Sequence, residues 1–248
     1  MAFVRQQPRQ LARLGGAALP LLVAACGGGT AASGPPAQPA ASGAGAVTAP
    51  VNRQVSASAE IGGLDQRAAE DSFRASLDGL QACVSDGFER LELMGGSIEF
   101  AVKVDAQQRA ASVWAAHSSL GERATEKCMF EALRSVSWPA PQGGVYGIAR
   151  SSFEFEQRKG APQPAVWDAQ RVAHVVEHLH DTLSECGGDQ VGDMLVTLYI
   201  GADGRALAGG AESEEPIDDA RVDCVVDALL AARYPRPGRT PAKVRFRL

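Results

Sequence analysis

The sequence is poor in the residues on which several functional classes depend. Aromatic residues make up 6% of the 248 residues, the formal net charge is −5, and lysine and arginine form no run. A nucleic-acid-binding surface is basic, and single-strand binding also uses aromatic side chains for base stacking. The composition therefore gives no support for a nucleic-acid partner.

Motifs for catalysis and cofactors are scarce as well. The chain has four histidines and five cysteines, no C-x-x-C motif, and no phosphate loop, paired catalytic acids or nucleotide fingerprint. We therefore expect a protein that is not an enzyme, with no cofactor, no metal and no small-molecule substrate. After residue 25 no apolar run is long enough to cross a bilayer.

The first 25 residues have the features of a bacterial export signal. Arg5, Arg9 and Arg13 form a basic region, and an apolar run from Leu14 to Ala25 follows. This run is too short for a stable transmembrane helix and ends in small residues, as signal peptides do. Removing three arginines from a chain of net charge −5 leaves a charge near −8.

The signal runs into the sequence LVAAC, which ends at Cys26 and resembles a bacterial lipobox. The resemblance implies cleavage before Cys26 and a lipid on that residue. Because Gly27 rather than aspartate follows, it also implies the outer membrane as the location. The alternative is an ordinary secreted protein with Cys26 at the cleavage site by chance.

Residues 26–60 consist mainly of glycine, alanine, serine and proline with almost no charge. Such a segment cannot bury a core, so we expect a flexible tether with a mean span of roughly 30 Å. It would hold a folded part away from a membrane.

The rest of the chain contains two similar stretches, offset by 96 residues. SIEFAVKVDAQQRA at 97–110 aligns with DMLVTLYIGADGRA at 193–206, and CMFEALRSVSWPAP at 128–141 with CVVDALLAARYPRP at 224–237. We expect two copies, residues 61–156 and 168–248, joined by a linker at 157–167.

Each copy shows the same order of signals. A helical segment (65–88 or 168–186) precedes an alternating strand (98–104 or 194–200), a turn and a second strand. A second helix ends before Trp138-Pro139 or Tyr234-Pro235, since proline cannot continue a helix, and a final strand follows. The expected fold is α+β, two tandem small α-β-β-α-β domains.

The sequence HVVEHLH, from His174 to His180, matches the H-x-x-E-H pattern of inverted zinc proteases. On a helical wheel His174 and His178 lie near Glu177, opposite the apolar stripe, and His180 points elsewhere. We therefore favour a solvated helix face. A metal-dependent hydrolase remains the alternative function.

Four cysteines remain after Cys26, two in each copy. An even number in an exported chain indicates disulfides. If both helices of a copy pack on one face of its sheet, the pairs are Cys83–Cys128 and Cys186–Cys224. Their loops of 45 and 38 residue steps would each contribute about 4 kcal/mol on the chain-entropy estimate.

These features together resemble the AgmX/PglI C-terminal domain, a TonB-like family of myxobacterial envelope and gliding-motility proteins. The resemblance covers about 62–156 and 168–248. It rests on the four cysteines and on Gly96, Ser118-Ser119, Trp138-Pro139-x-Pro141, Gly143, Gly144 and Pro235-x-Pro237. It implies a TonB-like fold, an envelope location and binding of a protein partner.

The chain also departs from the family pattern. Val84 and Gly187 stand where a tyrosine often follows the first cysteine, and Ser152-Phe153 replaces Pro-Phe. The second copy has Glu214-Glu215 instead of the double serine, which favours a mainly structural role for it. Ser118-Ser119 lacks a positioned base other than His117, so we expect a loop pair that bonds backbone groups rather than a nucleophile.

The predicted function is that of a lipid-anchored, protein-binding or scaffolding module in the cell envelope, and a purely structural spacer is a further alternative. TonB-like folds work through sheet edges, which are templates for an added strand. We expect the edge in the last strand of the first copy, and the alternative is that the other copy covers it. The candidate binding residues are Val145, Tyr146, Ile148, Phe153 and Phe155.

Overall fold

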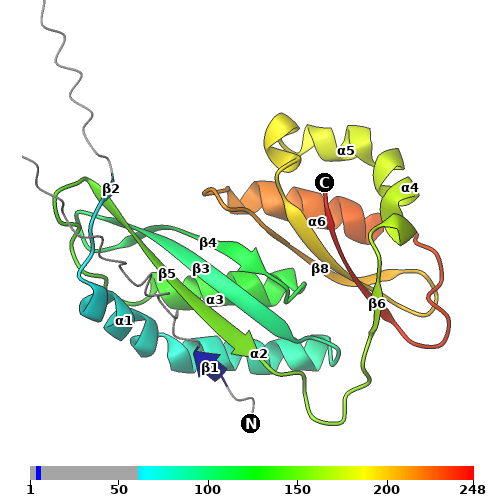
Figure 1. Ribbon diagram of the computed structural model, residues 1–248, viewed down its shortest axis with the longest axis horizontal. Coiled ribbons are helices and arrows are strands. Elements are labelled where there is room, and N and C mark those ends of the chain that lie inside the picture. The colour runs from blue at the N-terminus through cyan, green and yellow to red at the C-terminus, as the bar shows by residue number, and fades with distance from the viewer. Residues whose placement is uncertain (1–3, 7–60) are drawn as a thin grey trace, which may run out of the picture. The chain divides into compact units, whose positions relative to one another are not determined.

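The structure is a computed structural model that describes residues 4–6 and 61–248 (Figure 1). In these residues six α-helices and two β-sheets form a mixed α+β fold, as the sequence predicts. The predicted tether, Cys26 and the cleavage site lie outside the described residues.

The first half contains one sheet and three helices. The sheet order is β5 (Tyr146–Phe155), β3 (Gly96–Asp105) and β4 (Ala110–Ser118), all antiparallel. Two short strands, β1 (Val4–Gln6) and β2 (Ile61–Gly62), pair with the outer side of β5. The helices are α1 (Gln66–Ala75), α2 (Leu77–Arg90) and α3 (Arg123–Arg134).

The second half repeats this order. The sheet runs β6 (Ala165–Trp167), β9 (Ala242–Arg247), β7 (Leu195–Ile200) and β8 (Ala206–Glu212). The helices are α4 (Gln170–His178), α5 (His180–Glu185), the 3₁₀ helix η1 (Gly188–Val191) and α6 (Asp219–Ala231). Strand β6 lies in the segment that we expected to be linker, and it pairs in parallel with β9 as β2 does with β5.

The first helical segment of each half is divided where one helix was expected. Asp65 caps α1 by accepting a hydrogen bond from the Ala68 amide, and α1 ends at Ala75, directly before Ser76. The buried Ser76 hydroxyl donates to the Phe73 carbonyl, and such side-chain bonds compete with the helical backbone. In the second half α4 gives way to α5 at Leu179.

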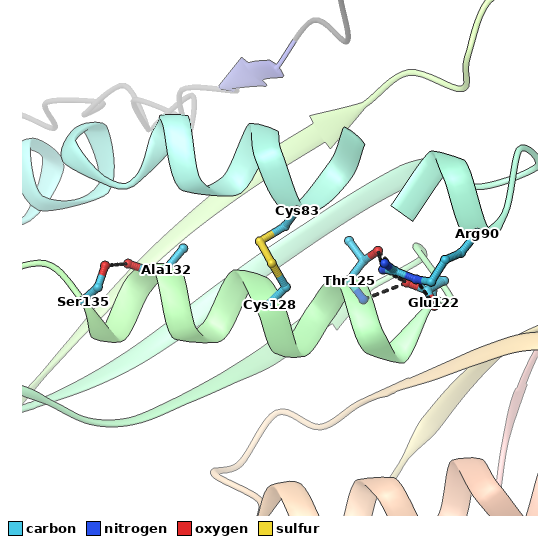
Figure 2. Close-up of a disulfide and its surroundings, with 7 residues drawn as sticks. All are labelled: Cys83, Arg90, Glu122, Thr125, Cys128, Ala132 and Ser135. Carbon is cyan, nitrogen blue, oxygen red and sulfur yellow. Dashed lines mark hydrogen bonds and ion pairs between the residues drawn. A yellow bond between two sulfur atoms is a disulfide. The ribbon is translucent and has the colours of Figure 1, made fainter. Parts of the chain in front are cut away.

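The helices of each half are joined by a disulfide. Cys83 of α2 bonds to Cys128 of α3, with their Cα atoms 5.7 Å apart (Figure 2). Cys186 bonds to Cys224 of α6, with a Cα separation of 5.6 Å. Both predicted pairings are therefore confirmed. Each disulfide joins the first helical segment of its half to the second helix.

Equivalent positions make the same contacts in the two halves. Gln108 and Gly204, which are 96 residues apart, both have positive φ in the hairpin turn. The amides of Trp138 and Tyr234, at the same offset, donate to the carbonyls of these two turn residues. Each aromatic side chain also donates to a helix carbonyl, at Leu133 or its equivalent Leu229.

Candidate functional site

The direction of the backbone groups along β5 follows from its neighbour β3. The backbone of Ser97 bonds to Ser119 and the amide of Asp105 bonds to Arg109, so both residues face the β4 side. Alternate residues of a strand direct their N–H and C=O groups to opposite sides. Ser97 is paired with Glu154, which therefore directs its backbone N–H and C=O groups away from β3. The register between β3 and β5 does not shift, so every second residue of β5 does the same. These residues are Tyr146, Ile148, Arg150, Ser152 and Glu154.

This outer side of β5 accepts extended segments at both of its ends. Strand β2 runs parallel to it at Tyr146 and Gly147, and β1 runs antiparallel to it at Phe153 to Phe155. Strand β1 belongs to the predicted signal peptide. Its pairing shows that the geometry of the β5 edge is compatible with an added antiparallel strand.

The predicted binding residues fall into three groups. Val145 precedes β5 and is 55% exposed. Tyr146 and Ile148 are half-buried and direct their backbone outward. Phe153 and Phe155 are buried in the first core, where Phe153 contacts Phe73 and Phe100, so their side chains support the sheet.

A groove of about 810 Å³ lies beside the carboxyl end of β5. One wall is the face of α2 that carries Asp78, Ser85 and Glu89, and the other is formed by residues 156–159. Its charges are mixed, because Arg158 and Lys159 lie opposite the acidic residues of α2. The groove residues 156–159 directly follow the part of β5 that pairs with β1.

The histidines of the H-x-x-E-H pattern lie on exposed helix surfaces. The rings of His174 and His178 are 4.1 Å apart, and His178 Nδ1 is 2.7 Å from the His174 carbonyl oxygen. His180 begins the next helix, with its Nδ1 3.4 Å from Asp181. Within residues 4–6 and 61–248, no group of three or more histidine, cysteine or acidic side chains is placed to hold a metal.

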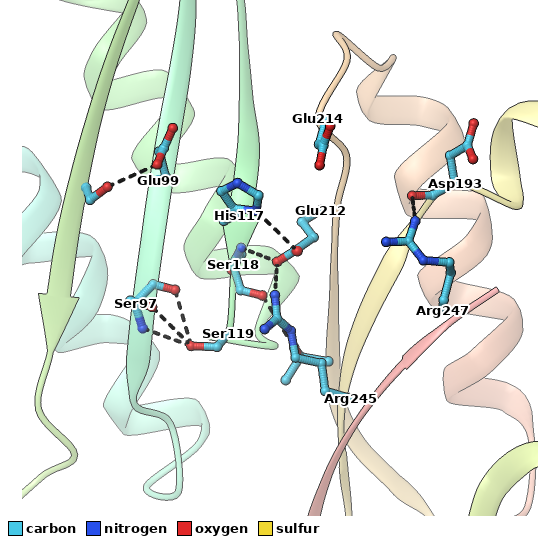
Figure 3. A network of polar contacts seen from close by, with 12 residues as sticks. Ser97, Glu99, His117, Ser118, Ser119, Asp193, Glu212, Glu214, Arg245 and Arg247 are labelled. Carbon is cyan, nitrogen blue, oxygen red and sulfur yellow. Dashed lines mark hydrogen bonds and ion pairs between the residues drawn. The ribbon is translucent and has the colours of Figure 1, made fainter. Parts of the chain in front are cut away.

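The opposite edge of the first sheet contacts the second half. The Ser118 amide and Arg245 of β9 both donate to the buried carboxylate of Glu212 in β8, and His117 Nδ1 lies 3.6 Å from it (Figure 3). The Ser213 amide donates to the Ala115 carbonyl at 3.1 Å. The second half thus covers the β4 edge, whereas β5 receives the N-terminal segments. Ser119 Oγ accepts from the Ser97 amide and Ser118 Oγ from the Leu120 amide, so both serines bond backbone groups as expected, but Ser118 is the last residue of β4 and not part of a loop.

Helices α3 and α6 carry opposite charges where they meet. Arg123, whose side chain is 9% exposed, donates to Asp219 at 2.7 Å and to Asp223 at 2.8 Å. Lys127 also pairs with Asp223, and Arg134 with Asp219. Burial raises the pKa of Asp223, but the hydrogen bonds from Lys127 and Arg123 outweigh it and leave the pKa lowered.

The buried carboxyl group of Glu126 lies between the contacts of Glu212 and the ion pairs that join α3 to α6. Glu126 of α3 is fully buried; its Oε1 accepts from Ser118 Oγ at 2.6 Å, and its Oε2 has no hydrogen-bond partner among the described residues. Burial raises the pKa of Glu126 to about 7, although the Ser118 hydrogen bond and Arg123 lower it. Gly210 of β8 faces this carboxyl group, and a Cβ there would lie 2.7 Å from Oε1.

Lys243 of β9 also contributes to the contact between the two halves. Its Nζ donates to the Gly95 carbonyl of the first half at 2.7 Å and lies 5.0 Å from the Tyr199 ring. Burial lowers the pKa of Lys243 to about 8, and Arg245 adds to the effect. Tyr199 itself packs into the first hydrophobic core.

Comparisons with protein-family models, with curated proteins and with solved structures gave no match. Among the helices of the described residues, none combines the length and the apolar character that crossing a membrane requires.

Sequence reasoning did not identify the residues that join the halves. Glu126 and Gly210 carry no motif, and Arg123 and Asp219 read as ordinary surface charges. One signal was present: Arg123 and Lys127 have opposite charge to the residues 96 positions later, Asp219 and Asp223. Corresponding helix faces of the two halves can attract one another when their charges differ in this way.

Proposed function

We propose that the chain is a lipid-anchored protein of the bacterial outer membrane, without enzymatic activity, that binds an extended segment of an envelope protein at the outer edge of β5. The pairing of β1 with β5 supports this proposal most directly. If signal cleavage removes residues 1–25, β1 leaves, and a partner strand takes its position antiparallel to β5.

The proposal includes two copies of one TonB-like unit on a flexible tether. The repeated contacts at Gln108 and Gly204 and at Trp138 and Tyr234 support the duplication. The first copy provides the binding edge. In the second copy Lys243, Arg245 and Arg247 alternate along β9, and β6 covers residues 242–244, so this copy acts mainly as a structural partner.

The test is site-specific photo-crosslinking in cells. A photoreactive amino acid at Glu156, which is exposed and directly follows the part of β5 that pairs with β1, should form a crosslinked product with another envelope protein. The matched control is Val166 of β6 in the second half, which is 90% exposed and should form no such product. Equal crosslinking from both positions, or none from Glu156, would contradict the proposal.

A further inference from the structure

The contact between the halves encloses a carboxyl group that has little room to move. An ideal Cβ at Gly210 would lie 2.7 and 2.8 Å from the two carboxyl oxygens of Glu126, so β8 passes directly over this group. One of the oxygens has no hydrogen-bond partner in the part of the chain that the structure describes. An ionised carboxylate in this position would be buried without a full set of donors, which is unfavourable.

Other charged groups face Glu126 from each neighbouring element. Glu122 and Arg123 belong to its own helix, and Glu122 pairs with Arg90 of α2. Glu212 of β8 adds a second carboxylate, which Arg245 of β9 and His117 of β4 contact. Three carboxyl groups, those of Glu122, Glu126 and Glu212, therefore lie near one another. Arg90 pairs with Glu122 and Arg245 pairs with Glu212.

We propose that the contact between the halves is a proton-linked clamp, in which protonated Glu126 holds β8 against β4 and ionised Glu126 releases it. Release would uncover the β4 and β8 edges. Uncovered edges are templates for strand addition, so the clamp would control a second binding surface. This inference does not depend on binding at β5.

The direction of the pH effect follows from the two pKa values of Glu126. The pKa of Glu126 is about 7 when the halves are docked, and the ordinary pKa of a glutamate is 4.5. Between pH 4.5 and pH 7 the docked state therefore binds a proton that the undocked state does not. Docking should therefore be strongest at acidic pH and weaken by up to tenfold per pH unit as the pH rises through this window.

The other titrating groups act mainly outside this range. Lys243 has a docked pKa of about 8 against 10.5, so its effect comes above pH 8 and has the opposite direction. The pKa of Asp223 is below 3.8, so its ion pairs weaken only in stronger acid. His117 of β4 also contacts Glu212, with its Nδ1 3.6 Å from the carboxylate, and a His117→Gln variant separates its contribution.

The test uses amide hydrogen exchange by NMR on the mature chain, with Cys26→Ser to keep it in solution. The Ser118 and Ser213 amides bond across the contact, whereas those of Val102 and Leu198 lie inside each sheet. From pH 5.5 to 7.5, protection at Ser118 and Ser213, corrected for intrinsic exchange, should fall about twentyfold and remain unchanged at Val102 and Leu198.

Glu126→Gln keeps the size of the side chain but cannot ionise. Protection in this variant should be as high at pH 7.5 as at pH 5.5, while the exposed control Glu131→Gln and the His117→Gln variant should keep the wild-type fall. The proposal is overturned if wild-type protection is flat, if Glu126→Gln keeps the fall or is unprotected throughout, if His117→Gln abolishes the fall, or if the core amides lose protection in parallel.

Discussion

Gly210→Ala should destabilise the contact between the two halves. The added Cβ would lie under 3.0 Å from both carboxyl oxygens of Glu126, a distance that real Cβ atoms essentially never show. Glu126 is fully buried and cannot turn to solvent while the halves are docked. Overpacking of this kind costs about 1–3 kcal/mol.

A double-mutant cycle, measured by urea unfolding, shows whether this cost arises from the close approach of residue 210 to Glu126. Glu126→Ala removes the group that Gly210→Ala would meet, so the second change should cost little in that background, with a coupling energy of about 1–3 kcal/mol. Gly63→Ala is the control, since a Cβ there meets nothing within 4 Å. A Gly210→Ala cost below about 0.5 kcal/mol, or an equal cost in both backgrounds, would refute the reasoning.

Three further predictions concern the cysteines and the histidines. A clickable fatty acid should label the wild-type chain in cells and not Cys26→Ser, and equal labelling of both would exclude lipidation at this residue. Non-reducing peptide mapping of the secreted chain should recover Cys83 with Cys128 and Cys186 with Cys224, and loss of either bridge should lower the free energy of unfolding by about 4 kcal/mol; mixed pairs or free thiols would count against the assignment. Elemental analysis of protein purified without chelator should find no stoichiometric zinc, whereas one zinc per chain that disappears in His178→Ala would restore the hydrolase hypothesis.

The larger elements could be predicted because their signals extend over many residues. Alternating apolar residues identified β3 and β7, and the turn residues and prolines placed the hairpins and the ends of α3 and α6. The cysteine pairing followed from packing two helices on one sheet face. Strands β2 and β6 were missed, because two or three residues are too few to show a period of two.

The contact between the halves could not be predicted for a different reason. Glu126 follows Arg123 in a helix whose exposed positions also carry charges, so its sequence does not show that it is buried. Its burial depends on Gly210, which comes from the other half and leaves the space that the carboxyl group fills. Backbone directions also needed the structure: Ile148 directs its N–H outward, whereas Ser151 directs its N–H toward β3.

This backbone direction allows the central claim, strand addition at β5, to be tested with one pair of variants. Glu154→Pro removes an outward donor at the position where β1 pairs and leaves the bonds to β3, whereas Glu154→Gln keeps the donor. With the photoreactive residue at Glu156, we expect the crosslinked product to persist in Glu154→Gln and to be lost in Glu154→Pro, with both disulfides formed in each. A product that survives in the folded, disulfide-bonded Glu154→Pro protein would show that the partner does not bind by adding a strand to β5.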